Sequence, residues 1–184
     1  MIPIIVIIAA IVIIALWVMR SYNGLVKLKN QVEEAFSTMD VYMKKRYDLI
    51  PNLVETVKGY AAHESKTLEQ VTAARTAAMD ARTIDDKIQK ENALNSTLKT
   101  LFAVSEAYPD LKANTNFMDL QHQLQTVEED IANARKYYNA SVKNLNNKIE
   151  MFPSNIIAGI FHFSKQTFFE VGAEEERQNV KVQF

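Results

Sequence analysis

The side chains that could bind a metal or act as a general base are few and widely spaced in this sequence. The 184 residues contain no cysteine and three histidines, which are His63, His122 and His162. His63-Glu64 begins like the zinc-protease motif HExxH, but Thr67 stands where the second histidine belongs. Asp119 and His122 have the spacing of half a di-iron motif, and no second pair accompanies them. We therefore expect neither a metal site nor a cofactor.

Other kinds of catalytic and ligand-binding motif are also missing. The four glycines are too dispersed to form a glycine-rich phosphate loop, and no serine lies in a nucleophile-elbow motif. The 21 basic and 22 acidic side chains balance, so the composition does not favour nucleic acid as a partner. The sequence predicts a protein that is not an enzyme.

Charged residues attract more interest where they interrupt an otherwise apolar helix face. Arg46 falls within such a face, and Glu91 lies on a second one. A buried arginine is tolerated when a carboxylate pairs with it, and the pair can fix how helices align. We predict a polar layer that joins Arg46 or Arg75 to Glu64 or Glu129, and the residues assigned to it are Arg46, Glu64, Arg75, Glu129 and Arg135. In the alternative, these side chains run along helix edges with their charged groups in water.

Apolar residues recur every three or four positions over most of the chain, which is the period of a helix. The pattern predicts helices over 25–60, 65–79, 84–105 and about 114–151, with a kink at Pro51 and a cap at Thr83. No glycine lies between Gly59 and Gly159, which argues against a strand-rich fold. We predict an all-α fold, in which an N-terminal transmembrane helix precedes an antiparallel up-and-down four-helix bundle and a short C-terminal helix or tail.

The N-terminal segment 2–19 is the least ambiguous part of the sequence. It has 18 residues without a charge, and as a helix it would reach about 27 Å, close to the thickness of a bilayer's hydrocarbon core. A cleaved signal peptide is a poor alternative, because nothing basic precedes Ile2 and no small-residue cleavage site follows. A buried core helix this uniform does not suit so small a domain. We expect a membrane anchor, with the lipid bilayer as a partner.

The charges beside the anchor predict its orientation. Basic residues follow the span and no charged side chain precedes it, which by the positive-inside rule places the N-terminus outside and the following domain in the cytoplasm. The residues expected at the membrane interface are Trp17, Arg20, Tyr22, Lys27 and Lys29.

The last 33 residues are unusually aromatic, since they hold six of the nine phenylalanines. The segment either forms a short helix that covers one end of the bundle or exposes a surface for the membrane or a second subunit. The residues predicted for such a docking surface are Ile156, Ile160, Phe161, Phe163, Phe168 and Phe169. The expected divisions are an anchor over 2–19, a long-helix bundle over 20–152 and an aromatic C-terminal helix and tail over 153–184.

The run Lys45-Arg46-Tyr47-Asp48-Leu49-Ile50-Pro51-Asn52-Leu53-Val54, continuing to His63-Glu64, resembles the signature of the bacterial LemA family. Agreement extends to Arg75, Tyr108-Pro109-Asp110-Leu111, Arg135, Tyr138-Asn139, Asn146 and Phe152-Pro153. The resemblance implies a single-pass protein of the bacterial inner membrane with a cytoplasmic helical bundle, and it supplies no catalytic residues to transfer.

Two functions remain open at this point. The first is a scaffold or assembly protein that associates with copies of itself through coiled-coil-like helix faces and organises or shapes the membrane. The alternative is a regulatory or adaptor partner of another membrane protein, such as a membrane protease.

Overall fold

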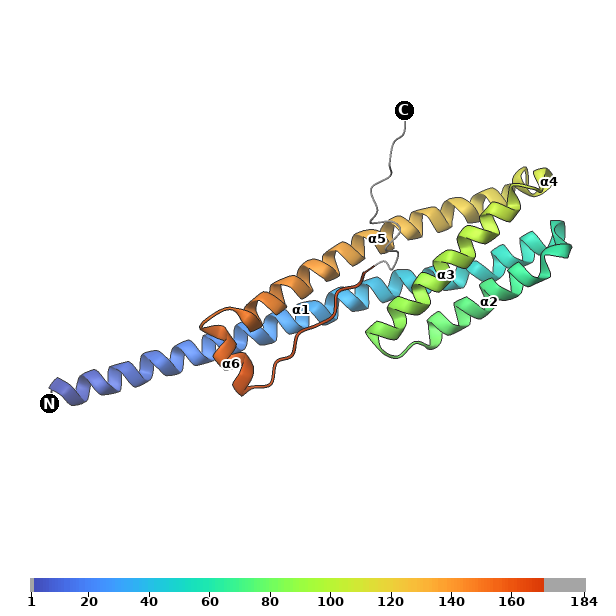
Figure 1. The fold of residues 1–184 in the computed structure, drawn as a ribbon. Helices are drawn as coiled ribbons and strands as arrows, with labels where there is room; N and C mark the ends of the chain where they lie inside the picture. Colours follow the sequence, from blue (N-terminus) through green and yellow to red (C-terminus); the bar gives the residue numbers. More distant parts are fainter. Residues whose placement is uncertain (1, 171–184) are drawn as a thin grey trace, which may run out of the picture. The chain divides into compact units, whose positions relative to one another are not determined.

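The computed structural model describes residues 2–170, and this part of the chain is helical with no strand (Figure 1). The helices are α1 (Ile2–Tyr60), α2 (Ser65–Asp80), α3 (Ile84–Ser105), α4 (Pro109–Lys112), α5 (Thr115–Glu150) and α6 (Ser154–Ile160), with a 3-10 turn at Ala62–Glu64. The predicted all-α class is confirmed. Residues 171–184 of the predicted tail lie outside the described residues.

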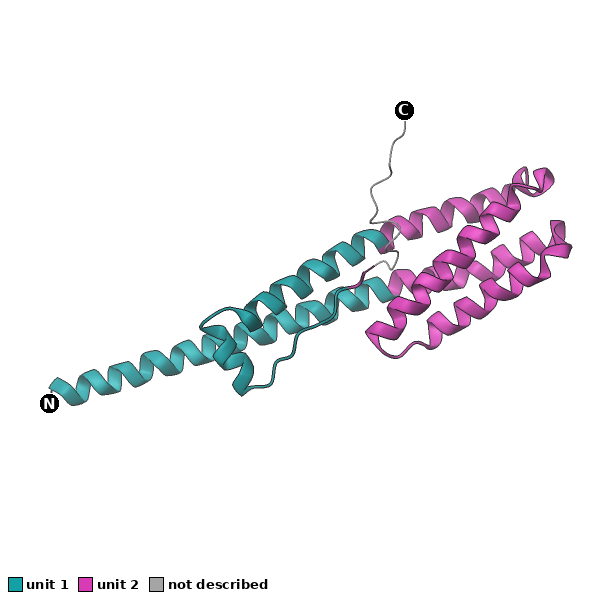
Figure 2. Cartoon of the chain, in the orientation of Figure 1, with its two compact units in different colours: residues 1–40, 132–168 teal, residues 41–131, 169–184 magenta. Residues whose placement is uncertain are grey.

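The chain divides into two compact units (Figure 2). Unit 1 contains residues 2–40 and 132–168, and unit 2 contains residues 41–131 with 169–170. Both α1 and α5 contribute one part to each unit.

Unit 2 is an antiparallel four-helix bundle. Its helices are the 41–60 part of α1, then α2, α3 and the 115–131 part of α5, each joined to the next by a short connection. The apolar faces predicted from the helical period are the buried faces. They include Ile50, Leu53, Val57, Leu68, Val71, Leu94, Leu98, Leu101, Phe117, Leu124 and Val127.

Polar side chains cap two helices of unit 2 where the sequence indicated a start. The Thr83 hydroxyl accepts a hydrogen bond from the Asp86 amide at 3.2 Å, at the start of α3. The Asn114 side-chain oxygen accepts from the Phe117 amide at 3.0 Å, at the start of α5. These caps satisfy amides that have no partner inside the helix, so they fix where each helix begins.

Unit 1 contains the 132–150 part of α5, α6 and an extended segment over residues 163–168, packed with the part of α1 that belongs to the same unit. Its buried residues are Leu25, Val32, Ala35 and Met39 of α1, Ala134, Tyr138, Val142 and Leu145 of α5, and Ile157 and Ala158 of α6. The Ser154 hydroxyl donates to the Lys148 and Met151 carbonyls at 2.7 and 2.9 Å, which satisfies carbonyls at the end of α5.

Side chains of α5 hold the extended segment in place. The Asn146 amide group donates to the Gln166 carbonyl and accepts from the Gln166 amide, each at 2.9 Å. The Tyr138 hydroxyl donates to the Thr167 carbonyl at 2.9 Å. The Asn146 side chain thus satisfies the backbone amide and carbonyl of Gln166, as a neighbouring strand would in a sheet.

The apolar N-terminal segment is part of α1, and none of its described residues is buried in the structure. One 18-residue window of this helix is long and apolar enough to cross a membrane, and none of it is buried. That exposure distinguishes the segment from the buried core helix of a water-soluble protein, because a core helix of such composition would be covered.

Candidate functional site

The most buried polar group of unit 2 is the guanidinium of Arg46, on α1. Arg46 is 1% exposed and forms an ion pair with Glu91 of α3, which is 2% exposed. Its Nη1 atom also donates to Glu128 Oε1 of α5 at 2.5 Å and to Asn95 Oδ1 of α3 at 2.6 Å. One arginine therefore joins three of the four bundle helices.

A tyrosine and a lysine extend this cluster. The Tyr47 hydroxyl donates a hydrogen bond to Glu91, so the buried carboxylate has two partners from α1. Lys87, which lies one turn before Glu91, places its Nζ atom 5.9 Å from the centre of the Tyr47 ring. We call Arg46, Tyr47, Lys87, Glu91, Asn95 and Glu128 the buried polar cluster; the Glu128 side chain, at its edge, is 43% exposed.

Arg75 of α2 compensates for the proline inside α1. Pro51 has no amide hydrogen, so it cannot donate to the carbonyl of Tyr47 four residues earlier. The Arg75 Nε atom donates to that same carbonyl at 2.6 Å. The helix runs through Pro51 to Tyr60 without a break, and α2 is attached to α1 at the point where the proline leaves an acceptor.

The chemistry available to the buried polar cluster is structural. Burying an ion pair costs solvation of both charges, and the cost is recovered only when partners with good geometry surround it. The ion pair fixes how α1 and α3 are aligned, because a shift of one helix along the other would leave Arg46 or Glu91 buried without its partner. The cluster and the Arg75 bond together engage all four helices of unit 2.

The arginine partners differ from those expected from the sequence. We expected Glu64 or Glu129 beside Arg46 or Arg75, whereas Glu91 and Glu128 pair with Arg46. Glu129 is exposed, because the neighbouring position on α5 turns toward the arginine instead. Arg135 is half-buried and belongs to unit 1.

Glu64 engages a tyrosine. The Tyr108 hydroxyl donates to Glu64 Oε1 at 3.1 Å, within unit 2. This bond to the carboxylate raises the pKa of Tyr108, with smaller contributions from partial desolvation and from the carboxylate charge.

The sequence reasoning noticed Glu91 on an apolar face but did not assign it to the polar layer, and it missed Tyr47, Lys87, Asn95 and Glu128. A usable signal was present for Glu91, since it interrupts the apolar positions of α3 as Arg46 interrupts those of α1. No such signal distinguishes Glu128 from Glu129, because a rotation of one residue decides which of them faces inward.

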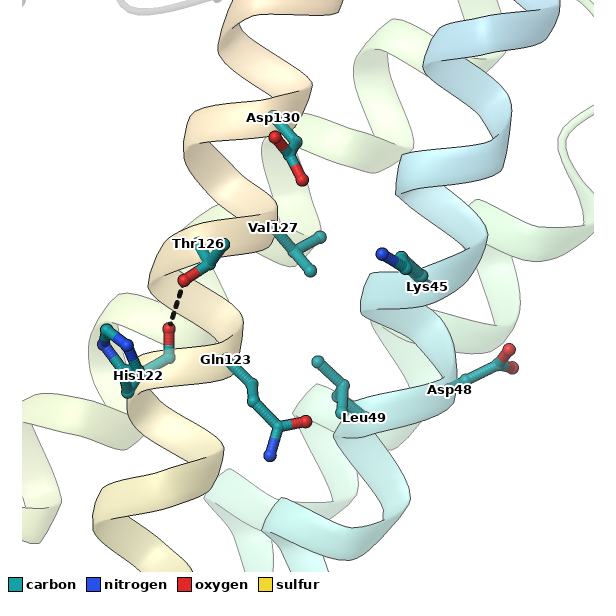
Figure 3. Close-up of a pocket in the computed structure, with 8 residues that line it drawn as sticks. All are labelled: Lys45, Asp48, Leu49, His122, Gln123, Thr126, Val127 and Asp130. Atoms are coloured by element: carbon teal, nitrogen blue, oxygen red, sulfur yellow. Dashed lines mark hydrogen bonds between the residues drawn. The ribbon is translucent and has the colours of Figure 1, made fainter.

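A surface groove lies between α1 and α5 in unit 2 (Figure 3). Its volume is about 330 Å³, and its lining residues are Lys45, Asp48, Leu49, His122, Gln123, Thr126, Val127 and Asp130. Leu49 and Val127 point into the space between the helices, whereas Asp48 and His122 point outward. An apolar floor with charged residues at the rim suits contact with a peptide or a helix better than catalysis.

The three histidines do not assemble a metal site. His63, His122 and His162 are all exposed. Within residues 2–170, no group of three histidine, aspartate or glutamate side chains is arranged to hold a metal ion.

The residues predicted for the membrane interface are exposed along α1. Trp17 is 36% exposed and Tyr22 is 37% exposed, and Arg20, Lys27 and Lys29 are also exposed. The Tyr22 ring lies 4.7 Å from the Phe161 ring and 5.9 Å from the Phe163 ring, measured between centres.

The residues predicted for a docking surface do not form one set. Ile156, Ile160 and Phe161 are exposed and belong to α6 or its end. Phe163 is half-buried, Phe168 is 38% exposed, and Phe169 is buried. The exposed apolar surface is continued by Met151 and Phe152, which the prediction omitted.

Comparison with known proteins places this fold in a family. An exposed apolar helix joined to a helical bundle with a buried polar cluster defines a class of membrane-associated helical proteins, and the sequence model of the LemA family matches residues 35–184. The chain belongs to the LemA family, which confirms the resemblance drawn from its motifs.

Individual relatives agree with this assignment. The chain is 26% identical over 162 residues to Protein LemA of Metamycoplasma hominis, an alignment that covers 86% of this chain and 72% of that protein. It is 23% identical over 190 residues to Magnetosome protein MamQ 2 of Paramagnetospirillum magneticum, covering 89% of this chain and 70% of that protein. Neither of these relatives is named as an enzyme.

Proposed function

We propose that the protein is a membrane-anchored scaffold that associates with copies of itself and thereby organises the membrane to which it is attached. The observation that carries the proposal is α1. One 59-residue helix contains both an apolar segment with no buried residue and the residues that build the bundle. Both segments belong to the same helix, which is continuous over Ile2–Tyr60.

The chemistry of unit 2 supports a role in assembly over a role in catalysis. Arg46 and Glu91 pair with each other and are both closed to solvent, so a substrate could not reach their charged groups. A bundle with a fixed helix alignment presents the same outer surface in every copy, which repeated association requires. The relatives named as magnetosome proteins fit a protein that acts at membranes.

We place the N-terminus outside the bacterial inner membrane and the bundle in the cytoplasm. Arg20, Lys27 and Lys29 follow the apolar segment closely, and Lys29 lies 3.8 Å from Glu33. Protease added to sealed spheroplasts should leave the bundle intact and digest it only after lysis. Digestion from outside would overturn this orientation.

Self-association can be tested by light scattering of the full-length protein in detergent, beside a version that lacks residues 1–19. We expect the full-length protein to have a mass of two or more times 21.0 kDa after the detergent is subtracted. If both versions are monomers over a range of concentrations, the scaffold proposal fails.

The alternative function, an adaptor for another membrane protein, is favoured by the groove of unit 2. Leu49 and Val127 offer an apolar floor, and Lys45 and Asp130 offer charges of both signs for a partner helix or peptide. An adaptor would co-purify from native membranes with one partner in fixed ratio, and Lys45→Glu, which reverses an exposed charge at the groove without touching the core, would abolish that co-purification while Asp48→Asn would not.

A further inference from the structure

The segment from Met151 to Phe161 has five large apolar side chains that are exposed and do not pack in the core of unit 1. The exposed fractions are 62% for Met151, 79% for Phe152, 49% for Ile156, 61% for Ile160 and 47% for Phe161. The inner face of α6 is supplied by Ile157 and Ala158, which are 2% and 1% exposed. The five exposed side chains, which we call the α6 patch, therefore do not contribute to the core of unit 1. They are Met151, Phe152, Ile156, Ile160 and Phe161.

The segment around the patch contains one basic side chain, the exposed imidazole of His162. No aspartate, glutamate, lysine or arginine occurs from Met151 to Ser164. The run is bounded by Glu150 and Lys165, which are exposed and form an ion pair with each other. A largely apolar loop closed by an ion pair at its base can enter an apolar phase while its base stays in water.

The position of the patch along α1 indicates what covers it. The Phe161 ring contacts the Tyr22 ring in a tilted arrangement, and Tyr22 lies three residues, or about 4.5 Å along the helix, beyond the end of the apolar segment at Met19. Any group in contact with this turn of α1 stands at the level where hydrocarbon gives way to headgroups once the anchor spans the bilayer. A tyrosine at that level is usual for membrane proteins.

We propose that the α6 patch docks into the same bilayer that holds the anchor, with Phe152 and Ile160 inserted among the lipids at the interface. This proposal rests on the membrane anchoring in the proposed function and adds a second point of attachment. One helix fixes only the depth of unit 1, whereas a helix and a lateral patch also fix its tilt. A second copy of the chain is the competing occupant of the patch. The position of Tyr22 at the membrane interface favours the bilayer, because a contact between two copies would not require that position.

The absence of cysteine makes the test direct, because single cysteines can be introduced and labelled with a fluorophore. The full-length chain would be reconstituted into phosphatidylcholine and phosphatidylglycerol vesicles at a high lipid-to-protein ratio. The patch variants are Phe152→Cys and Ile160→Cys. Tyr137→Cys is the matched control, since Tyr137 is 46% exposed in unit 1 and its hydroxyl lies 3.4 Å from the side-chain amide of Gln31, about 18 Å along α1 from Met19.

Labels at positions 152 and 160 should be quenched by lipids that carry a nitroxide near the headgroup, and protected from iodide in the aqueous phase. Their depth should lie within about 5–10 Å of the boundary between headgroups and acyl chains. The label at position 137 should show the opposite behaviour. Iodide quenching at 152 and 160 equal to that at 137 would overturn the proposal.

Two further results would also overturn it, and they separate its failure from that of the proposed function. Protection from iodide without quenching by the lipid probe, lost on dilution with lipid, would assign the patch to a second copy and leave the scaffold proposal standing. A label at Leu16→Cys that is not quenched by lipid probes at any depth would remove the anchor, and with it both proposals.

Discussion

The two units of the molecule bury different kinds of side chain between their helices. Unit 2 buries an arginine, a lysine and a glutamate in its core and connects them with a tyrosine and an asparagine. Unit 1 buries no charged side chain among its described residues and relies on aromatic contacts and on the backbone bonds of Asn146. Specific pairing dominates one unit, and coverage of apolar surface dominates the other.

This difference indicates how far each unit covers its own apolar side chains. The core of unit 2 is closed by its own side chains, so its stability should depend on the buried pairs and little on the environment. Unit 1 leaves five large apolar side chains around α6 exposed. Its stability should therefore depend on contact with a bilayer, as well as on its internal bonds.

The largest effect should come from breaking the buried ion pair. Arg46→Met leaves Glu91 buried without its counter-charge, so we expect a loss of about 3–5 kcal/mol in the free energy of unfolding. Urea titration followed by circular dichroism measures this loss. Lys45→Met, at the exposed neighbouring position, should change it by less than about 0.5 kcal/mol.

Replacing both charges should recover much of the loss. In Arg46→Met with Glu91→Leu, neither member of the pair is left in the core without the other, so the free energy of unfolding should return toward the wild-type value. An Arg46→Met protein that unfolds like the wild type would contradict the view that unit 2 depends on specific pairing.

The next effect should come from the bond between Arg75 and the Tyr47 carbonyl. Arg75→Met leaves that carbonyl without its donor and should cost about 1–3 kcal/mol. In a Pro51→Ala background the amide of residue 51 can donate to the same carbonyl, so the same substitution should cost less there. Equal costs in both backgrounds, measured by urea titration as a double-mutant cycle, would show that Arg75 acts in some other way.

A smaller and local effect is expected in unit 1. Asn146→Ala removes both hydrogen bonds to Gln166, and we expect about 1–2 kcal/mol less protection of the extended segment. Limited proteolysis near residue 166 measures this protection directly. Asn146→Asp keeps the acceptor and loses the donor, so it should lie between the alanine variant and the wild type. Faster cleavage in unit 2 instead would contradict the assignment.

The smallest effect is one of pH. The pKa of Tyr108 is raised in the folded protein above its ordinary value of about 10, because its hydroxyl donates to Glu64. The stability that this bond contributes is therefore fully present below pH 10 and is lost as the pH rises through the raised pKa. Tyr108→Phe should abolish this part of the alkaline decline in melting temperature. A decline of unchanged size in that variant would exclude Tyr108 as its source.

Much of the fold could be predicted from the sequence, because helical period and capping are local signals. The apolar positions of 84–105 predict the buried face of α3, and Thr83 caps that helix as its sequence indicates. Pro51 was expected to kink the first long helix, and the helix continues through it with its lost acceptor bond supplied by Arg75. That bond joins residues 28 positions apart, which no local pattern reveals.

The polar residues were harder to predict for the same reason. Arg46 and Arg75 were recognised, but their partners depend on how four helices rotate against each other. Glu128 and Glu129 are adjacent and chemically identical, so only the packed bundle distinguishes the pairing residue from the exposed one. Asn146 contacts a segment without helical period, and its role therefore left no trace in the periodicity.

Cross-linking in native membranes tests the central claim, self-association of the anchored bundle, most directly. An amine-reactive cross-linker suits the exposed lysines of α1, and the products are separated by mass after tagged purification. The account predicts a ladder at multiples of 21.0 kDa that persists at low expression. A single cross-linked product containing one copy of this chain and one other membrane protein would contradict self-association and favour the adaptor function.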